Sequence, residues 1–246
     1  MDVLAIELNA LQFLQGSFTF AFVLISLILG LIIILKYFQY RKRQYILVGI
    51  TWIFLVSPYW PDAISFLLIL ITGEPLPTVF YFFIANAFIA PLHVTWIIVI
   101  TDFIFKEKQK VVLSVFSAEA IIFEIAFLTI FFIDPTLIGN TTANPFYVEW
   151  ALFIDIYLII SIALFLITGI LFARESLKAD KRELNLRGWF LLTAFITFTV
   201  GTLIDIIPEL TEVTIVIARL FVIVGAFSFY LGFTMPQFIK NLLIKQ

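Results

Sequence analysis

Long blocks of apolar residues alternate with short polar stretches along the chain. Most blocks run for about 20 residues or more, the length of α-helix that crosses a bilayer core about 30 Å thick. A transmembrane barrel would instead show segments of about 10 residues with alternating apolar and polar positions. The pattern predicts seven membrane helices, at residues 10–37, 44–72, 77–105, 110–133, 147–174, 187–207 and 212–240. The expected fold is an all-α, seven-transmembrane helix bundle in which residues 1–246 form a single domain.

Prolines fall inside two of the predicted helices. Pro58 and Pro61 lie in the second helix and Pro91 lies in the third. Because proline has no backbone N–H and its ring clashes with the preceding turn, it breaks or kinks a helix. We expect both helices to bend and to open space inside the bundle.

Lysine and arginine are distributed unevenly among the predicted loops. The first, third and fifth loops and the C-terminal tail are basic. The second, fourth and sixth loops carry acidic residues such as Asp134 and Glu149 and no lysine or arginine. Basic loops stay on the cytoplasmic side of a membrane. With seven helices, this asymmetry predicts a multi-pass protein of the cell membrane with its N-terminus outside the cell and its C-terminus in the cytoplasm.

The composition excludes several kinds of binding site and catalytic site. Hydrophobic residues make up 63% of the chain and charged residues 13%, and the net charge of -2 offers no basic surface to a nucleic acid. The chain has no cysteine, which excludes disulfides, cysteine-bound zinc and thiol nucleophiles. It has one histidine, His93, and no serine-hydrolase, phosphate-loop or dinucleotide motif. We therefore expect no enzymatic activity, no metal site and no cofactor.

Several ionisable residues fall inside the predicted helices. A charged side chain at the centre of a bilayer costs at least about 2.5 to 3.5 kcal/mol on insertion scales, so such residues usually face the protein interior. Those expected in the outer half of the membrane are Arg219, Asp155, Asp205, Glu124 and Asp62, and those expected near the midplane are Glu119 and His93. Arg219 is the only basic residue outside the cytoplasmic loops and tail, so it can neutralise one or two of these carboxylates but not all.

Two interpretations of these residues stay open. In the first, Arg219 forms one buried ion pair and the other carboxylates reach water near helix ends. In the second, helices two to seven surround a polar pocket, open to the outside, that binds a proton, a cation or a small cationic ligand. Excess negative charge in a medium of low dielectric constant would favour such a positive guest.

Two surface features suggest further sites. A glycosylation sequon begins at Asn140 in the longest outer loop, although it could also occur there by chance. The fifth loop carries Arg174, Lys178, Lys181 and Arg182 on the cytoplasmic side. These four residues could contact a cytoplasmic signalling protein, or they could serve only to fix the topology.

The layout of seven helices with an outer N-terminus resembles the microbial opsins and the G-protein-coupled receptors. An opsin needs a lysine in its last helix to bind retinal, but the only basic residue between Glu212 and Pro236 is Arg219. Retinal is therefore excluded. The acidic-Arg-aromatic triplet of the receptor family is also missing from the inner end of the third helix, where Asp102 is followed by Phe-Ile-Phe.

The end of the last helix reads Tyr230-Leu-Gly232-Phe233 and continues Pro236-Gln-Phe238-Ile-Lys240. This stretch, together with the layout, resembles the seven-transmembrane sensor region of prokaryotic membrane histidine kinases and related receptors. The resemblance implies a receptor or sensor. Because the chain carries no kinase core before Gln246, its output would have to be a separate cytoplasmic protein.

Transport is the alternative function. The intramembrane carboxylates could form a relay in a transporter or channel for protons, cations or a small solute. A third possibility is a structural subunit whose polar residues pair with another chain. A continuous acidic path to the cytoplasmic side would favour transport, whereas a cavity closed below Glu119 would favour sensing.

Overall fold

The structure is a computed structural model that describes residues 7–206 and 211–243. Within these residues, seven helical segments are long and apolar enough to cross a membrane, as the sequence predicts. The helices are α1 (Ala10–Tyr40), α2 (Arg43–Leu55), α3 (Trp60–Thr72), α4 (Thr78–Asn86), α5 (Ile89–Phe103), α6 (Gln109–Ile133), α7 (Leu152–Leu177), α8 (Arg182–Asp205), α9 (Glu212–Thr234) and α10 (Gln237–Leu243). Together, α2 with α3 and α4 with α5 form the second and third spans.

Both spans that contain prolines are broken, as predicted. A 3₁₀ turn at Ser57–Tyr59, which includes Pro58, separates α2 from α3, and Pro61 lies in the first turn of α3. The third span breaks between Asn86 and Ile89, one turn before Pro91. This position follows from the missing N–H of proline, which cannot donate to the carbonyl of the residue four positions earlier.

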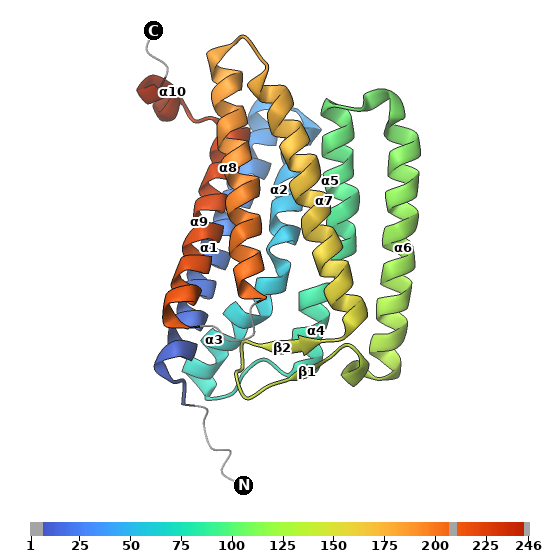
Figure 1. Cartoon of the computed structure of the whole chain (residues 1–246), viewed down its shortest axis with the longest axis vertical. Coiled ribbons are helices and arrows are strands. Elements are labelled where there is room, and N and C mark those ends of the chain that lie inside the picture. The colour runs from blue at the N-terminus through green and yellow to red at the C-terminus, as the bar shows by residue number, and fades with distance from the viewer. Residues whose placement is uncertain (1–6, 207–210, 244–246) are drawn as a thin grey trace.

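The segment that precedes α7 differs from the prediction. The fifth helix was expected to begin at residue 147, but Val148–Trp150 form strand β2, which pairs antiparallel with strand β1 (Gly139–Thr141). Helix α7 begins only at Leu152. Strand pairing prevails because Trp150 packs its ring against Phe82 of α4, with 5.4 Å between ring centroids. The hairpin lies across one end of the bundle (Figure 1).

The end of the last span also differs from the prediction. Helix α9 ends at Thr234 instead of residue 240, and Met235 adopts a left-handed conformation with φ of 39°. Pro236 disfavours a helical conformation at the residue before it. A separate short helix, α10, follows at the end of the molecule opposite the hairpin (Figure 1). The predicted end of the sixth helix at residue 207 lies outside the described residues.

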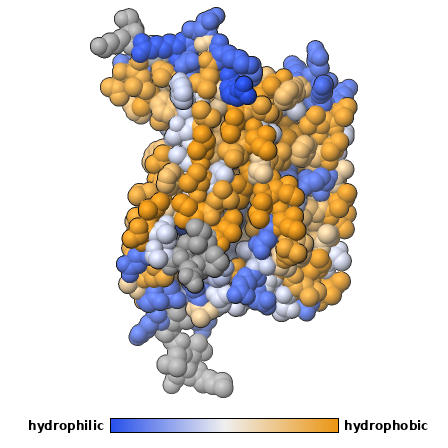
Figure 2. Space-filling model, viewed as in Figure 1, coloured by the Kyte–Doolittle hydropathy of each residue, from blue (hydrophilic) through white to orange (hydrophobic). Residues whose placement is uncertain are grey.

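The surface and the core agree with a multi-pass membrane protein. On the face shown in Figure 2, a broad apolar region covers the middle of the bundle, and hydrophilic residues gather at its two ends. Aromatic side chains fill the middle of the bundle and the half nearer α10. The rings that form this aromatic layer are Trp52, Trp96, Phe165, Phe195, Phe198 and Phe229. The half of the bundle that carries β1 and β2 is called the hairpin half below.

Candidate functional site

A cavity of about 570 Å³ occupies the hairpin half of the bundle. Its volume is within the range of about 300 to 1,000 Å³ that is typical of small-molecule sites. The walls come from α1 to α5, including the 3₁₀ turn after α2, and from α7, α8 and α9, and residues 146–150 of the hairpin line it as well. The bends at Pro58 and ahead of Pro91 place the start of α3 and the end of α4 at this cavity, since Asp62 and Asn86 both line it.

One wall carries the ion pair expected for Arg219. Its Nη1 atom donates to Oδ2 of Asp205 over 2.5 Å, and the hydroxyl of Tyr59 donates to the same oxygen over 2.9 Å. The guanidinium carbon also lies 5.0 Å from the centre of the Tyr59 ring, within cation–π range. Nε of Arg219 and Oδ1 of Asp205 are buried and have no partner among the described residues. The pair therefore retains hydrogen-bonding capacity that a ligand or water could use.

A second carboxylate is fixed on the wall formed by α3 and α4. The hydroxyl of Tyr81 donates to the carboxylate of Asp62, and both side chains are buried. Asn86, five residues beyond Tyr81 on α4, also lines the cavity. Its Nδ2 donates to the backbone carbonyl of Phe82 over 2.9 Å, while its Oδ1 is buried with no partner in the described part of the chain. This wall thus offers acceptor atoms to the cavity.

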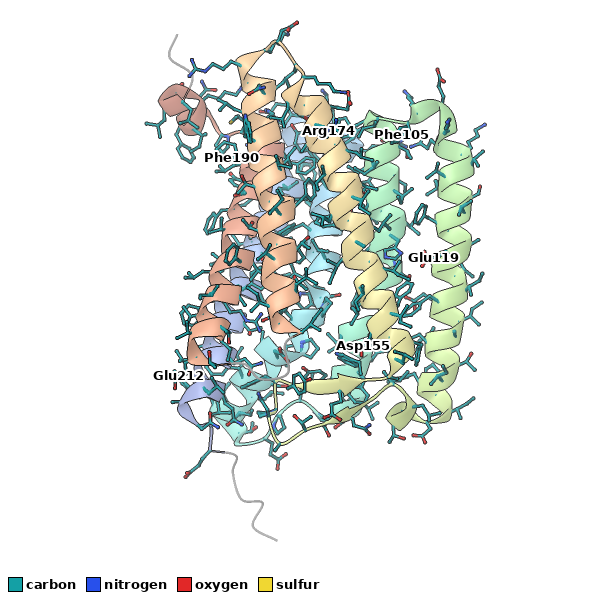
Figure 3. The ribbon with its side chains drawn as sticks, in the orientation of Figure 1. Phe105, Glu119, Asp155, Arg174, Phe190 and Glu212 are labelled. Carbon is teal, nitrogen blue, oxygen red and sulfur yellow. The ribbon has the colours of Figure 1, made fainter. Side chains whose placement is uncertain are left out.

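Asp155 lies on α7, at the rim of the cavity. Its side chain is exposed and makes no hydrogen bond or ion pair with the residues that the structure describes. Figure 3 shows it near the hairpin end of α7. Of the three aspartates that the described lining contains, Asp62 and Asp205 have hydrogen-bonding partners, and Asp155 has none among the described residues.

The two residues predicted near the midplane form a separate network beside the cavity. Nδ1 of His93 lies 3.1 Å from Oε2 of Glu119, and Nε2 lies 2.8 Å from the hydroxyl of Ser161. Ser161 donates to the carbonyl of Tyr157 over 2.6 Å, so it accepts a hydrogen bond from His93. The hydroxyl of Tyr157 also lies 3.4 Å from Nδ1 of His93. Of the members of this network, Ser161 lines the cavity.

The seven ionisable residues thus do not form one pocket. Four of them line the cavity, namely Asp62, Asp155, Asp205 and Arg219. His93 and Glu119 belong to the neighbouring network, and Glu124 is half-buried on α6, outside the cavity lining. Figure 3 places Glu119 farther from the hairpin end than Asp155. The separation arises because α6 packs against its neighbours through Ala120, Phe123, Phe127 and Phe131, which leaves its carboxylates off the central axis.

Sequence reasoning missed the tyrosines of the site. Tyr59 donates to Asp205 and Tyr81 donates to Asp62, although the pattern of apolar blocks gave the two tyrosines no special role. No signal in the sequence linked Tyr59 to Asp205, which lies on α8. Nor did any signal link Tyr81 to Asp62, which lies on a different helix.

The remaining predicted residues lie on the surface. Asn140 is exposed in β1, at the hairpin end. Arg174, Lys178, Lys181 and Arg182 are exposed around the turn between α7 and α8, at the opposite end, where Figure 3 labels Arg174. Lys178 pairs with Glu175 over 2.6 Å. The other three make no salt bridge within residues 7–206 and 211–243.

Metal ligands are not gathered in the described part of the chain, where no group of three or more histidine, aspartate or glutamate side chains is placed to hold an ion. Comparisons with protein-family models, with curated proteins and with solved structures give no significant match.

Proposed function

We propose that this chain is a seven-helix membrane receptor or sensor that binds a ligand in the hairpin-half cavity and signals to a separate cytoplasmic protein. The shape of the cavity supports this proposal. Its lining reaches Leu92, Ile162 and Phe198 and does not extend toward α10, where the aromatic layer fills the bundle. Trp52 stacks on Phe229 with 4.3 Å between ring centroids. A cavity that is closed toward α10 suits ligand binding better than transport, because a permeation path needs a polar lining that continues to both sides of the membrane.

The proposed orientation has the hairpin outside the cell and α10 in the cytoplasm. The loops at the hairpin end contain no lysine or arginine, whereas the turn between α7 and α8 at the other end is basic. Positively charged loops remain in the cytoplasm during insertion. The cavity would then face the outer leaflet and the outer solution.

Charge favours a cationic ligand. Within the described residues, the lining contains Asp62, Asp155, Asp205 and Glu149 but only one cation, Arg219. A net negative lining in a medium of low dielectric constant attracts a positive group more strongly than it would in water. We propose that the ligand binds in the cavity without reacting there.

The route of the signal would run along α8 and α9. Asp205 and Arg219 join these helices at the cavity, and Arg187 of α8 donates to the carbonyl of Phe233 in α9 over 3.0 Å near their other ends. Lys240 of α10 pairs with Glu183 of α8 over 2.7 Å. A ligand that changes the spacing of Asp205 and Arg219 would therefore move a connected cytoplasmic surface. The exposed basic residues beside it, Arg174, Lys178, Lys181 and Arg182, would contact the partner.

Ion flux through liposomes that contain the purified protein tests the proposal against transport. We expect no proton or cation flux above that of empty liposomes, from protein shown to be folded by its elution as a single species. Flux that Asp155→Asn abolishes and that Asp134→Asn leaves unchanged would overturn the receptor proposal and make the cavity carboxylates a permeation path. Asp134 is a suitable control because it caps the 3₁₀ turn Pro135–Leu137 and does not line the cavity.

A further inference from the structure

The open side of the cavity lies between α7 and α8. These two helices diverge toward the hairpin end (Figure 1), and residues of both line the cavity there. Ile156 and Ile159 of α7 line it while remaining 48% and 51% exposed on the apolar flank of the bundle. At the hairpin end itself, Tyr147, Val148 and Trp150 are part of the lining. The opening that the described residues outline therefore faces lipid as well as the outer solution.

The wall next to this opening is apolar over most of its length. Ile156, Ile159 and Ile162 line it from α7, and Phe198 and Phe54 face them across the cavity. Asp155 stands at the rim of the same wall. One end of the opening thus offers a carboxylate and the rest offers hydrocarbon, and this arrangement matches a molecule that has a charged head and an apolar chain.

Asp155 indicates the sign of the head group. Its carboxylate has no hydrogen-bonding partner among the described residues, and it lies in the first turn of α7, near the hairpin end (Figure 3), beside the exposed apolar side chains of Ile156 and Ile159. An unpaired charge at that place is unfavourable unless a counter-charge or water meets it. An ammonium group can donate up to three hydrogen bonds to carboxylate oxygens and remove this penalty.

We infer that the ligand of this cavity is a cationic amphiphile, a long-chain amine of the outer leaflet, which enters sideways between α7 and α8 and places its ammonium group against Asp155. This inference rests on the proposed ligand-binding function and names the class of ligand. The alkyl chain would lie along Ile156, Ile159 and Ile162. The Arg219–Asp205 pair would lie farther inside, where the ordering of the chain could change its geometry.

Photolabelling in nanodiscs of neutral phosphatidylcholine tests the inference. The probes are a single-chain alkylamine of 14 carbons with a diazirine in its chain, the matching uncharged alcohol, and a water-soluble amine of four carbons with the same photoreactive group. We expect the long amine to label α7 or α8, and its half-saturating concentration to rise about tenfold or more in Asp155→Asn, as loss of a charge-assisted hydrogen bond predicts. The alcohol should label wild type no better than the amine labels the variant.

A pair of matched variants tests the sideways entrance. Ile159→Trp places a large ring in the opening, whereas Ile160→Trp places the same ring on a neighbouring residue that is 54% exposed and outside the lining. We expect only the first to reduce labelling by the long amine. Both variants should elute as single species with unchanged thermal unfolding.

Five results would overturn the inference. The head group would be wrong if amine and alcohol label equally, or if Asp155→Asn has no effect. The sideways entrance would be wrong if Ile159→Trp and Ile160→Trp change labelling by the long amine equally. The class would be wrong if the four-carbon amine labels as well as the long one, although a ligand-binding receptor would then still stand. Absence of any labelling in folded protein would also reject the amphiphile, whereas the flux measurement independently decides between receptor and transporter.

Discussion

Arg219 organises the polar chemistry of the cavity because, among the residues that the structure describes, it is the one cation in the cavity wall. Its side chain is 2% exposed, so its charge must be met by protein groups or by a ligand. Asp205 supplies the counter-charge, and the ring of Tyr59 supplies a negatively polarised face. A buried pair of this kind is costly to break, because removal of either partner leaves the other charge uncompensated.

This pairing predicts that the effects of substituting Arg219 and Asp205 on stability are coupled. Arg219→Gln and Asp205→Asn should each lower the free energy of unfolding by about 3 to 5 kcal/mol. The double variant should lose less than the sum, because neither charge is then left alone. Unfolding in mixed micelles, followed by tryptophan fluorescence, gives the three values. Additive losses would show that the two groups do not depend on each other.

The hydrogen-bond directions around His93 give a second prediction. Nε2 of His93 donates to Ser161, and an amide at position 119 can still form a hydrogen bond with Nδ1 of the ring. Glu119→Gln should therefore stay within about 1 kcal/mol of wild type, whereas Glu119→Met should cost about 1 to 3 kcal/mol by removing this partner of a buried ring nitrogen. The same unfolding measurement compares the two variants. Equal losses would mean that a hydrogen bond from position 119 does not stabilise the network.

At the scale of single residues, the sequence predicted the need for a pair but not its members. One basic residue among several carboxylates implied that Arg219 must meet at least one of them. Asp62, Glu124, Asp155 and Asp205 were equivalent candidates, because each was expected in the outer half of the membrane. Because α8 packs on α9, Asp205 is the carboxylate that pairs with Arg219, whereas Asp62 accepts a hydrogen bond from Tyr81.

At the scale of elements, the contact between α8 and α9 depends on Gly201. A Cβ atom at this position would lie 2.8 Å from the carbonyl oxygen of Ala218 and 2.7 Å from a side-chain carbon of Val222. The absence of a side chain therefore allows the two backbones to approach, as small residues do between membrane helices. Ala218 directly precedes Arg219, so this contact also positions the ion pair.

Gly201→Ala is expected to push α8 and α9 apart. The overpacking should cost about 1 to 3 kcal/mol of unfolding free energy. Thr193→Ala, at an exposed position of the same helix, should change the value by no more than about 0.5 kcal/mol. Both values come from unfolding in mixed micelles. A Gly201 variant as stable as wild type would show that the helices can separate locally without loss.

The elements themselves were largely predictable from the sequence, with two instructive exceptions. Long apolar blocks gave the seven spans, and prolines gave the breaks near Ser57 and before Pro91. The hairpin was missed because Val148–Trp150 join α7 in one apolar run, and periodicity does not separate a short strand from the start of a helix. The end of α9 was missed by six residues, although Pro236 marked it.

At the scale of the whole molecule, the apolar region between two hydrophilic ends fits a multi-pass membrane protein (Figure 2). The proposed direction of insertion depends on the charges at those ends. The hairpin end carries Asp134 and Glu149 and the α10 end carries the basic turn at residues 178–182. The positive-inside rule therefore predicts that the hairpin lies outside the cell.

Because the chain contains no cysteine, single cysteines report the orientation directly. Ala143→Cys in the hairpin should react with a membrane-impermeant maleimide on intact cells. Asp180→Cys in the turn between α7 and α8 should react only after permeabilisation. Both side chains are exposed, so access to the reagent depends on the membrane alone. The reverse pattern would invert the topology and would also remove Asn140 from the glycosylated side.

The sequence by itself determined the class of fold, the number of spans, their breaks and the presence of charges inside the bundle. These properties are local, because a chain in lipid must satisfy its own backbone within each helix, so an apolar run of sufficient length already specifies a span. Only the tertiary structure decided which carboxylates line the cavity, which one meets Arg219, and that His93 and Glu119 stand apart from them. These features depend on which helices are neighbours, and neighbours are not encoded in composition, because lipid-facing and protein-facing apolar positions use the same residues.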